Sequence, residues 1–192
     1  DYPYPHATAV DGALSAGGGM EYPMITVIGG AGSDADLDRI ITHEVGHNWC
    51  YGILGSNERD HAWMDEGVNS FNEQRYMAKK YPKDSVQSSM QANIAGINVN
   101  IGKLLGVPDL SEETLFDLGY RFNAVKKLDQ PVDLTSAEYT RINYGTVVYG
   151  KTAVILTYLQ AYLGTELYDK CAQAYFEKWK FKHPYPEDLK KV

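Results

Sequence analysis

Residues 43–47 read His43-Glu44-Val45-Gly46-His47 and fit the pattern H-E-x-x-H. An α-helix has about 3.6 residues per turn, so side chains four positions apart project from the same face. Both imidazoles of this stretch can therefore reach one point beside the helix.

The flanking sequence favours helices on both sides of a short loop. Ser33 followed by Asp36 resembles a capping box and predicts a helix from about Asp34 to Tyr51, because apolar residues then recur at helical spacing (Leu37, Ile40, Ile41, Val45). A second helical stripe ends before Pro82 and contains Val68, Phe71, Arg75 and Ala78. We expect the two helices to pack antiparallel.

Two imidazoles on one helix face suggest a zinc site that needs one more ligand. Catalytic zinc takes three protein ligands and leaves a fourth position open to water. Glu66 follows His47 by 19 residues, a gap that lets the chain reverse and place Glu66 early on the second helix. We therefore expect one Zn²⁺ per chain, held by His43, His47 and Glu66.

Glu44 is expected to act on protons rather than to bind the metal. It is rotated by about 100° around the helix from its neighbour His43 and so borders the open side of the site. A carboxylate there can take a proton from an activated water and return it to a leaving amine. The pattern thus predicts metal-assisted hydrolysis of peptide bonds with Glu44 as general acid/base.

Other residues near this pattern are open to two interpretations. Glu73 lies seven residues after the third ligand on the same helix face, where it either receives the free N–H of a ligand histidine or is simply solvated. Cys50 lies one turn beyond the motif, and we favour a small buried hydrophobic role over ligation. His6, His61 and His183 have no partner at ligand spacing, which favours surface or packing roles.

The chain as a whole predicts an α+β domain over residues 1–192. Residues 1–32 are rich in glycine, proline and β-branched residues and form a small β-rich part, whereas residues 33–192 form a mainly helical body. Further helices are expected at Ser85–Leu105, Tyr144–Leu163 and Glu166–Lys180, with a long irregular connection between Pro108 and Pro131 and a first helical turn at Pro186–Leu189.

Composition argues against several other classes of protein. The chain has 25 acidic and 18 basic residues, a formal charge of -7, and its lysines and arginines are scattered, which disfavours nucleic acid as a partner. The most apolar stretch, residues 146–163, is interrupted by Lys151 and Gln160 and is expected to be a buried helix rather than a membrane span. Two cysteines cannot form a disulfide framework. We identify no targeting segment in the chain.

Three motifs together resemble the alanyl-aminopeptidase family of gluzincins, which includes the leukotriene-hydrolysing enzymes. That family carries G-x-M-E-N, then H-E-x-x-H with a glutamate in a W-x-x-E-G setting, then a tyrosine in Y-x-K-G. In this chain the corresponding stretches are residues 17–21, 43–67 and 149–151, in the same order. The resemblance covers most of the chain, and three ordered motifs are more specific than any one of them.

The resemblance implies a thermolysin-like metallopeptidase catalytic domain. It implies that Glu21 binds the free α-amine of a peptide substrate, with Gly18, Gly19 and Met20 beside it contacting the substrate. It also implies that Tyr149 donates a hydrogen bond to the tetrahedral oxyanion, although Tyr144 is a competing phenol. Both roles are physically reasonable, since a carboxylate pairs with an ammonium and a phenol stabilises an anion.

Two positions depart from the family pattern: Tyr22 stands where asparagine is usual, and Thr152 where glycine is usual. These two departures bear on contacts to the substrate backbone and on packing behind Tyr149. Members of the family also carry a β-rich domain upstream and a helical domain downstream of the catalytic one. We expect the chain to be the catalytic fragment of a larger enzyme that lacks both.

The favoured function is zinc-dependent release of N-terminal residues from peptides. A thermolysin-like zinc endopeptidase shares the same ligands and is the main alternative. A non-catalytic gluzincin-like binding or scaffold domain is an alternative from a different class, and epoxide hydrolysis is a minor one.

Overall fold

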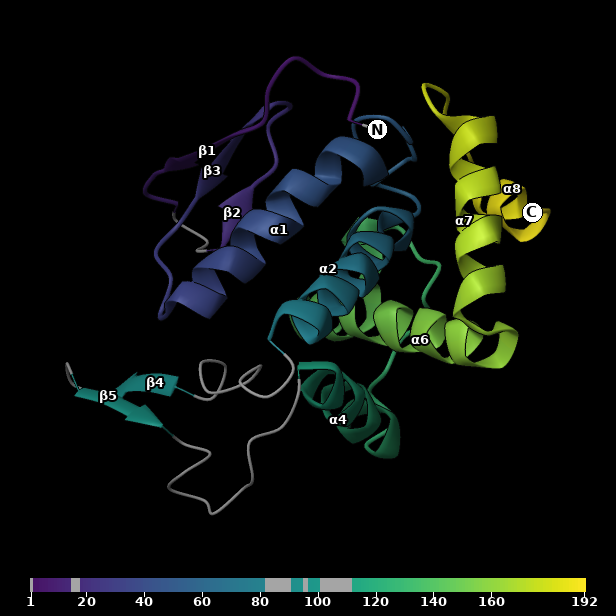
Figure 1. The fold of residues 1–192 in the computed structure, drawn as a ribbon. Helices are drawn as coiled ribbons and strands as arrows, with labels where there is room; N and C mark the ends of the chain where they lie inside the picture. The colour runs from purple at the N-terminus through teal and green to yellow at the C-terminus, as the bar shows by residue number, and fades with distance from the viewer. Residues whose placement is uncertain (1, 15–17, 82–90, 95–96, 101–111) are drawn as a thin grey trace.

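The computed structural model describes residues 2–14, 18–81, 91–94, 97–100 and 112–192. A small three-stranded sheet stands beside a set of helices that occupies most of these residues (Figure 1). This arrangement confirms the predicted β-rich beginning and mainly helical body. Within the described residues, no helix is long and apolar enough to span a membrane.

The sheet contains β1 (Thr8–Asp11), β3 (Ile25–Ile28) and β2 (Gly19–Met20), in that spatial order. The central strand β3 runs parallel to β1 and antiparallel to β2, with Met20 opposite Val27. Thr26 and Ile28 on β3 are buried. The sheet lies along the first long helix, α1 (Figure 1). Just before β3, the backbone N–H of Met24 donates a hydrogen bond to Oδ1 of Asn48 on that helix (3.0 Å).

Helix α1 (Asp34–Cys50) begins where the sequence predicts. The Ser33 hydroxyl accepts a hydrogen bond from the backbone N–H of Asp36. Acidic residues in the first turn stabilise the helix through their attraction to the positive end of its dipole. A 3₁₀ turn, η1 (Ala62–Met64), leads into α2 (Glu66–Lys80), which packs against α1. The two predicted helices around the H-E-x-x-H motif are therefore confirmed.

Helices from the second half of the chain pack behind α2. Phe71 of α2 forms a buried cluster with Ala153 and Leu156 of α6 (Thr152–Leu163), and Tyr168 of α7 (Thr165–Trp179) packs on it. The segment ahead of α6 is a π-helix, η3 (Tyr144–Lys151), preceded by η2 (Ser136–Glu138) and α5 (Arg141–Asn143). A short helix, α8 (Pro186–Lys190), follows α7.

Two expectations for the middle of the chain are wrong. The predicted helix Ser85–Leu105 contains instead the antiparallel strands β4 (Gln91–Ile94) and β5 (Ile97–Asn100); its remaining residues lie outside the described part. The sequence here alternates β-branched residues with asparagine, which has low helix propensity, so a strand pair is the better local fit.

The predicted irregular connection contains a helix, α4 (Glu112–Val125). Leu115, Leu118, Phe122 and Val125 recur at helical spacing, a pattern that the flanking prolines obscured.

Candidate metal centre

The structure brings His43, His47 and Glu66 together. Nε2 of His43 lies 3.2 Å from Nε2 of His47 and 3.2 Å from Oε2 of Glu66, and that same oxygen lies 3.3 Å from Nε2 of His47. Ligands about 2.1 Å from one tetrahedral zinc ion are about 3.4 Å apart. Two imidazole nitrogens and one carboxylate oxygen at these separations therefore fit a zinc ion in both chemistry and spacing.

The electrostatics of this trio favour a positive charge between its members. Burial disfavours an imidazolium at His43, but hydrogen bonds to Glu66 and Glu73 outweigh it and raise the His43 pKa to about 9. At His47, burial is likewise outweighed by hydrogen bonds to Asp65 and Glu66, and its pKa rises to about 11. Burial opposes charge on Glu66, yet the two histidines lower its pKa to about 2.

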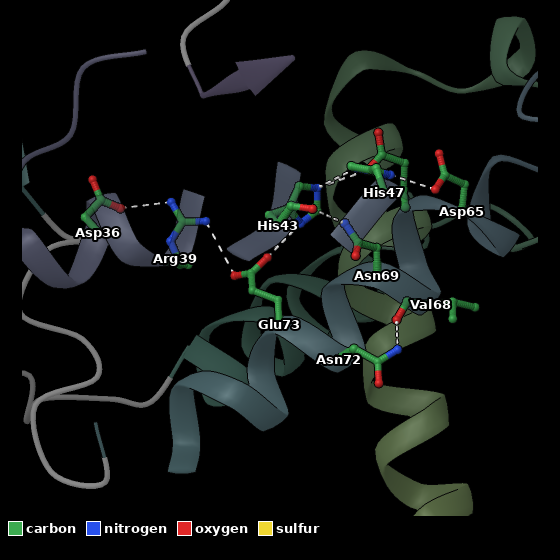
Figure 2. Close-up of polar contacts among 10 residues, drawn as sticks. Asp36, Arg39, His43, His47, Asp65, Val68, Asn69, Asn72 and Glu73 are labelled. Atoms are coloured by element: carbon green, nitrogen blue, oxygen red, sulfur yellow. Dashed lines mark hydrogen bonds and ion pairs between the residues drawn. The ribbon is translucent and has the colours of Figure 1, made fainter. Parts of the chain in front are cut away.

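Each of the two histidines has a buried carboxylate next to its Nδ1 atom. Nδ1 of His43 lies 2.7 Å from Oε2 of Glu73, and Nδ1 of His47 lies 2.7 Å from Oδ1 of Asp65 (Figure 2). Glu73 is 4% exposed and Asp65 0%. Such contacts make Nδ1 the donor and leave Nε2 to face the metal position.

Of the two interpretations of Glu73, the structure favours the contact with a histidine, because its Oε2 lies beside Nδ1 of His43. Sequence reasoning missed Asp65, because its contact with His47 depends on how the chain turns into α2. The available signal was chemical: a histidine expected to bind zinc needs an acceptor for its second nitrogen, and Asp65 is an acidic residue at the start of the facing helix.

Helices α1 and α2 approach each other closely next to His43. Asn69 of α2 donates a hydrogen bond from Nδ2 to the backbone oxygen of His43 (2.7 Å). A Cβ atom at Gly46 would lie 2.1 Å from Asn69 Oδ1, so a side chain there would displace the amide. Gly46, one of the two variable positions of the motif, thus allows Asn69 to contact α1. Sequence reasoning also missed this pair.

Glu44 lies on the sheet side of the trio and is 6% exposed. Burial raises its pKa to about 7, against the opposing charge of the histidines. Among the described residues, Oε2 of Glu44 has no hydrogen-bond partner. A Cβ atom at Gly19 would lie 2.2 Å from Cγ of Glu44, so strand β2 can pass this close only with glycine there.

The motif around β2 reaches the same site. Carboxylate oxygens of Glu21 and Glu44 and a ring nitrogen of His47 all lie within 4.8 Å of one another. Gly18, with φ of 72°, adopts a left-handed conformation, and Met20 pairs with Val27 in the sheet. Gly17, the first residue of the motif, lies outside the described residues.

Tyr149 reaches the trio from η3. Its ring stacks on His43 with centroids 5.9 Å apart and planes at 21°, and Tyr144 packs edge-on against Tyr149 at 6.0 Å. Burial, followed by the charge of Glu66, raises the Tyr149 pKa far above its ordinary value, so the hydroxyl stays protonated and can donate. Both phenols are near the site, and their order of importance stays a prediction.

Thr152, which stands where the family usually has glycine, packs against a glycine on α2. A Cβ atom at Gly67 would lie 2.4 Å from Cγ2 of Thr152, so Gly67 makes room for the larger residue. The Thr152 hydroxyl donates to the backbone oxygen of Val147, a buried contact within the helical turn behind Tyr149.

Other residues considered from sequence belong to neither group of close metal-ligating atoms among the described residues. Nδ1 of His61 contacts Asp133 at 2.6 Å, and Nδ1 of His183 contacts the backbone oxygen of Gly55 at 2.9 Å. Cys50 is buried and belongs to neither group of close metal-ligating atoms in the part of the chain that the structure describes. His6 is exposed.

Known proteins resemble this chain in sequence and in fold. The model of the peptidase family M1 domain matches residues 1–192. Leucine aminopeptidase 2 of Chaetomium globosum is 26% identical over 172 residues, which are 86% of this chain and 24% of that protein. Leucine aminopeptidase 2 of Lodderomyces elongisporus is 27% identical over 181 residues, 86% of this chain and 26% of that protein. The chain thus spans about a quarter of the length of these relatives.

Solved structures agree with the fold. The M1 zinc metallopeptidase of Deinococcus radiodurans superposes with a TM-score of 0.65 at 17% identity, covering 98% of this chain and 35% of that one. Leukotriene A4 hydrolase of Saccharomyces cerevisiae gives a TM-score of 0.65 at 20% identity, covering 100% of this chain and 28% of that one. Since the family model spans every residue of the sequence, the chain belongs to peptidase family M1.

Proposed function

We propose that this chain carries the catalytic centre of a zinc-dependent aminopeptidase, in which His43, His47 and Glu66 hold one zinc ion. The observation that carries the proposal is the set of three donor atoms on α1 and α2, all within 4.8 Å of one another. When bound, zinc supplies a Lewis acid that polarises the scissile carbonyl and makes water nucleophilic near neutral pH.

Glu44 is proposed as the group that moves the proton. Its buried carboxylate, with one oxygen free of hydrogen bonds among the described residues, can accept a proton from water and pass it to the leaving amine. Tyr149 is proposed to donate its phenolic hydrogen bond to the oxyanion that develops at the scissile carbonyl. Its raised pKa supports this role, because the donor stays protonated.

Glu21 is proposed to select substrates with a free N-terminus. A carboxylate beside Glu44 can form a charge-assisted hydrogen bond with the substrate ammonium. With the amine held there, the first peptide bond lies nearest to Glu44, which fixes the register of cleavage. Gly18, Gly19 and Met20, in and before β2, are proposed to border the substrate on this side. Several relatives are named leucine aminopeptidase 2, and this name supports the proposal of exopeptidase activity.

The resemblance further suggests that an upstream β-rich domain and a downstream helical domain complete the substrate cleft in the complete gene product. Activity is therefore best measured on that product.

The test compares specificity constants for an aminoacyl anilide and for an N-acetylated peptide. Glu21→Ala should lower kcat/KM for the free-amine substrate by roughly 10–100-fold and affect the acetylated peptide far less. Glu166→Gln, an exposed carboxylate on α7 paired with Lys170, is the matched control and should change neither constant. If the ratio of kcat/KM for the free-amine substrate to kcat/KM for the acetylated peptide is unchanged in Glu21→Ala, a thermolysin-like endopeptidase is favoured. If the unmutated protein binds zinc but hydrolyses neither substrate, a scaffold domain is favoured.

A further inference from the structure

We propose that Arg39 is a positioning residue of the metal centre, which holds Glu73 in the orientation that binds His43 and thereby increases the affinity for zinc. The inference rests on the proposed function, because it concerns the same zinc site. It extends that site to Arg39, whose guanidinium pairs with Glu73.

The two carboxylate oxygens of Glu73 have different surroundings. Oε2 lies 2.7 Å from Nδ1 of His43, whereas Oε1 has no hydrogen-bond partner among the described residues. Nη1 of Arg39 lies 3.6 Å from Oε1, so the guanidinium is an ion-pair partner of this nearly buried carboxylate (Figure 2). One oxygen therefore faces the histidine and the other faces the arginine.

Arg39 is itself anchored at the start of α1. Its Nη2 donates to Oδ1 of Asp36 at 2.9 Å, and Oδ2 of Asp36 accepts the backbone N–H of Gly32 at 3.0 Å. The backbone N–H of Asp36 donates in turn to the capping hydroxyl of Ser33. Asp36 at the capped start of α1 thus holds Nη2 of the guanidinium, while Nη1 faces Glu73 on α2.

Arginine suits this position physically. Its planar guanidinium can meet two carboxylates along fixed directions, which a lysine ammonium on a flexible stem does less well. A buried carboxylate without a nearby cation is unfavourable and tends to reorient toward other partners. If Glu73 turned away, Nδ1 of His43 would lose its acceptor and the ring would lose the constraint that aims Nε2 at the metal.

Spacing on α1 makes the arrangement specific. Arg39 and His43 are four residues apart and share one helix face, and Glu73 approaches both from the facing helix. Arg75, on the same helix as Glu73, forms an ion pair at 2.8 Å with Asp169, a carboxylate that is 47% exposed and far from buried. The exposed fractions of the two arginine side chains are similar, 32% and 34%, so Arg75 offers a matched control.

The experiment measures zinc dissociation constants of the metal-free complete gene product by competition with a chromophoric chelator. Arg39→Gln should raise the constant by roughly 3–10-fold, and Glu73→Gln, which changes the direct acceptor, by roughly 10–100-fold. Arg39→Lys should recover part of the loss, and Arg75→Gln should match the unmutated protein. The double variant Arg39→Gln/Glu73→Gln should bind zinc within about twofold of Glu73→Gln alone, because Arg39 acts through Glu73.

Each result separates the inference from the proposed function. Unchanged affinity in Arg39→Gln, or losses that simply multiply in the double variant, would overturn the role of Arg39 while the zinc site stands. Absence of zinc binding by the unmutated protein would overturn both. Near-UV circular dichroism shows whether Arg39→Gln folds. If it does not, Arg39→Lys replaces it in the test. A zinc affinity of Arg39→Lys equal to that of the unmutated protein would then contradict the need for a guanidinium at this position.

Discussion

Asp65 Oδ1 lies 2.7 Å from Nδ1 of His47, and both side chains are almost completely removed from solvent. The residue that orients one proposed metal ligand is thus the immediate neighbour of another, Glu66. A single turn at the start of α2 supplies both a ligand and the acceptor for the histidine on the facing helix. Changes at Asp65 should therefore affect the metal before they affect the fold elsewhere.

Asp65→Asn should weaken zinc binding by roughly 10–100-fold, because the amide is a poorer acceptor and no longer favours the required tautomer of His47. Chelator competition measures the change. Asp133→Asn, which alters the carboxylate that contacts His61, is the control and should retain the original affinity. Equal losses in both variants would mean that the effect at Asp65 is general destabilisation.

Zinc binding should release protons and strengthen with rising pH. In the metal-free protein the pKa of His43 is raised to about 9 and that of His47 to about 11, so at neutral pH each holds a proton that the metal must displace. Affinity should increase by up to about tenfold per pH unit for each displaced proton.

Calorimetry in buffers of different ionisation enthalpy counts these protons. About two protons, one from each histidine, should be released per zinc near neutral pH. His183→Gln removes a histidine outside the trio and should leave the count unchanged. A count of zero would show that both histidines are already neutral and that their hydrogen bonds to carboxylates do not raise their pKa values above neutral pH.

Glu44→Gln should retain zinc and lose hydrolysis by roughly 10²–10⁴-fold, since an amide of the same shape cannot accept a proton. Zinc content and kcat are measured on the same sample. Activity close to that of the unmutated protein would assign the proton transfer to another group.

Tyr149→Phe should lower kcat by roughly 10²–10³-fold if its hydroxyl is a principal oxyanion donor. Tyr144→Phe is the matched comparison, because the two rings contact each other and both lie on η3. A larger loss from Tyr144→Phe would reverse the assignment of the two phenols.

The sequence allowed the centre of the site to be predicted because its geometry is local and periodic. His43 and His47 are one helical turn apart, and Glu73 lies two turns after Glu66 on one face, so helical spacing alone relates the members of each pair. Asp65 was missed because its role depends on how the chain turns into α2, which spacing does not specify.

The errors in the fold have a similar origin. Residues 91–100 contain apolar residues that fit either a helix or a strand over a short window, and pairing between β4 and β5 decides for strands. The prolines near residues 108 and 131 suggested a loop, although a helix fits between them as α4. The contact between Gly46 and Asn69 joins residues 23 positions apart and becomes visible only once α1 and α2 are packed.

The most direct test of the account is anomalous scattering at the zinc edge from crystals of the complete gene product grown with zinc and without chelator. The account predicts one peak in this chain, about 2.0–2.2 Å from Nε2 of His43, Nε2 of His47 and a carboxylate oxygen of Glu66. No peak at these three atoms, or a zinc ion held by other residues of the chain, would contradict it.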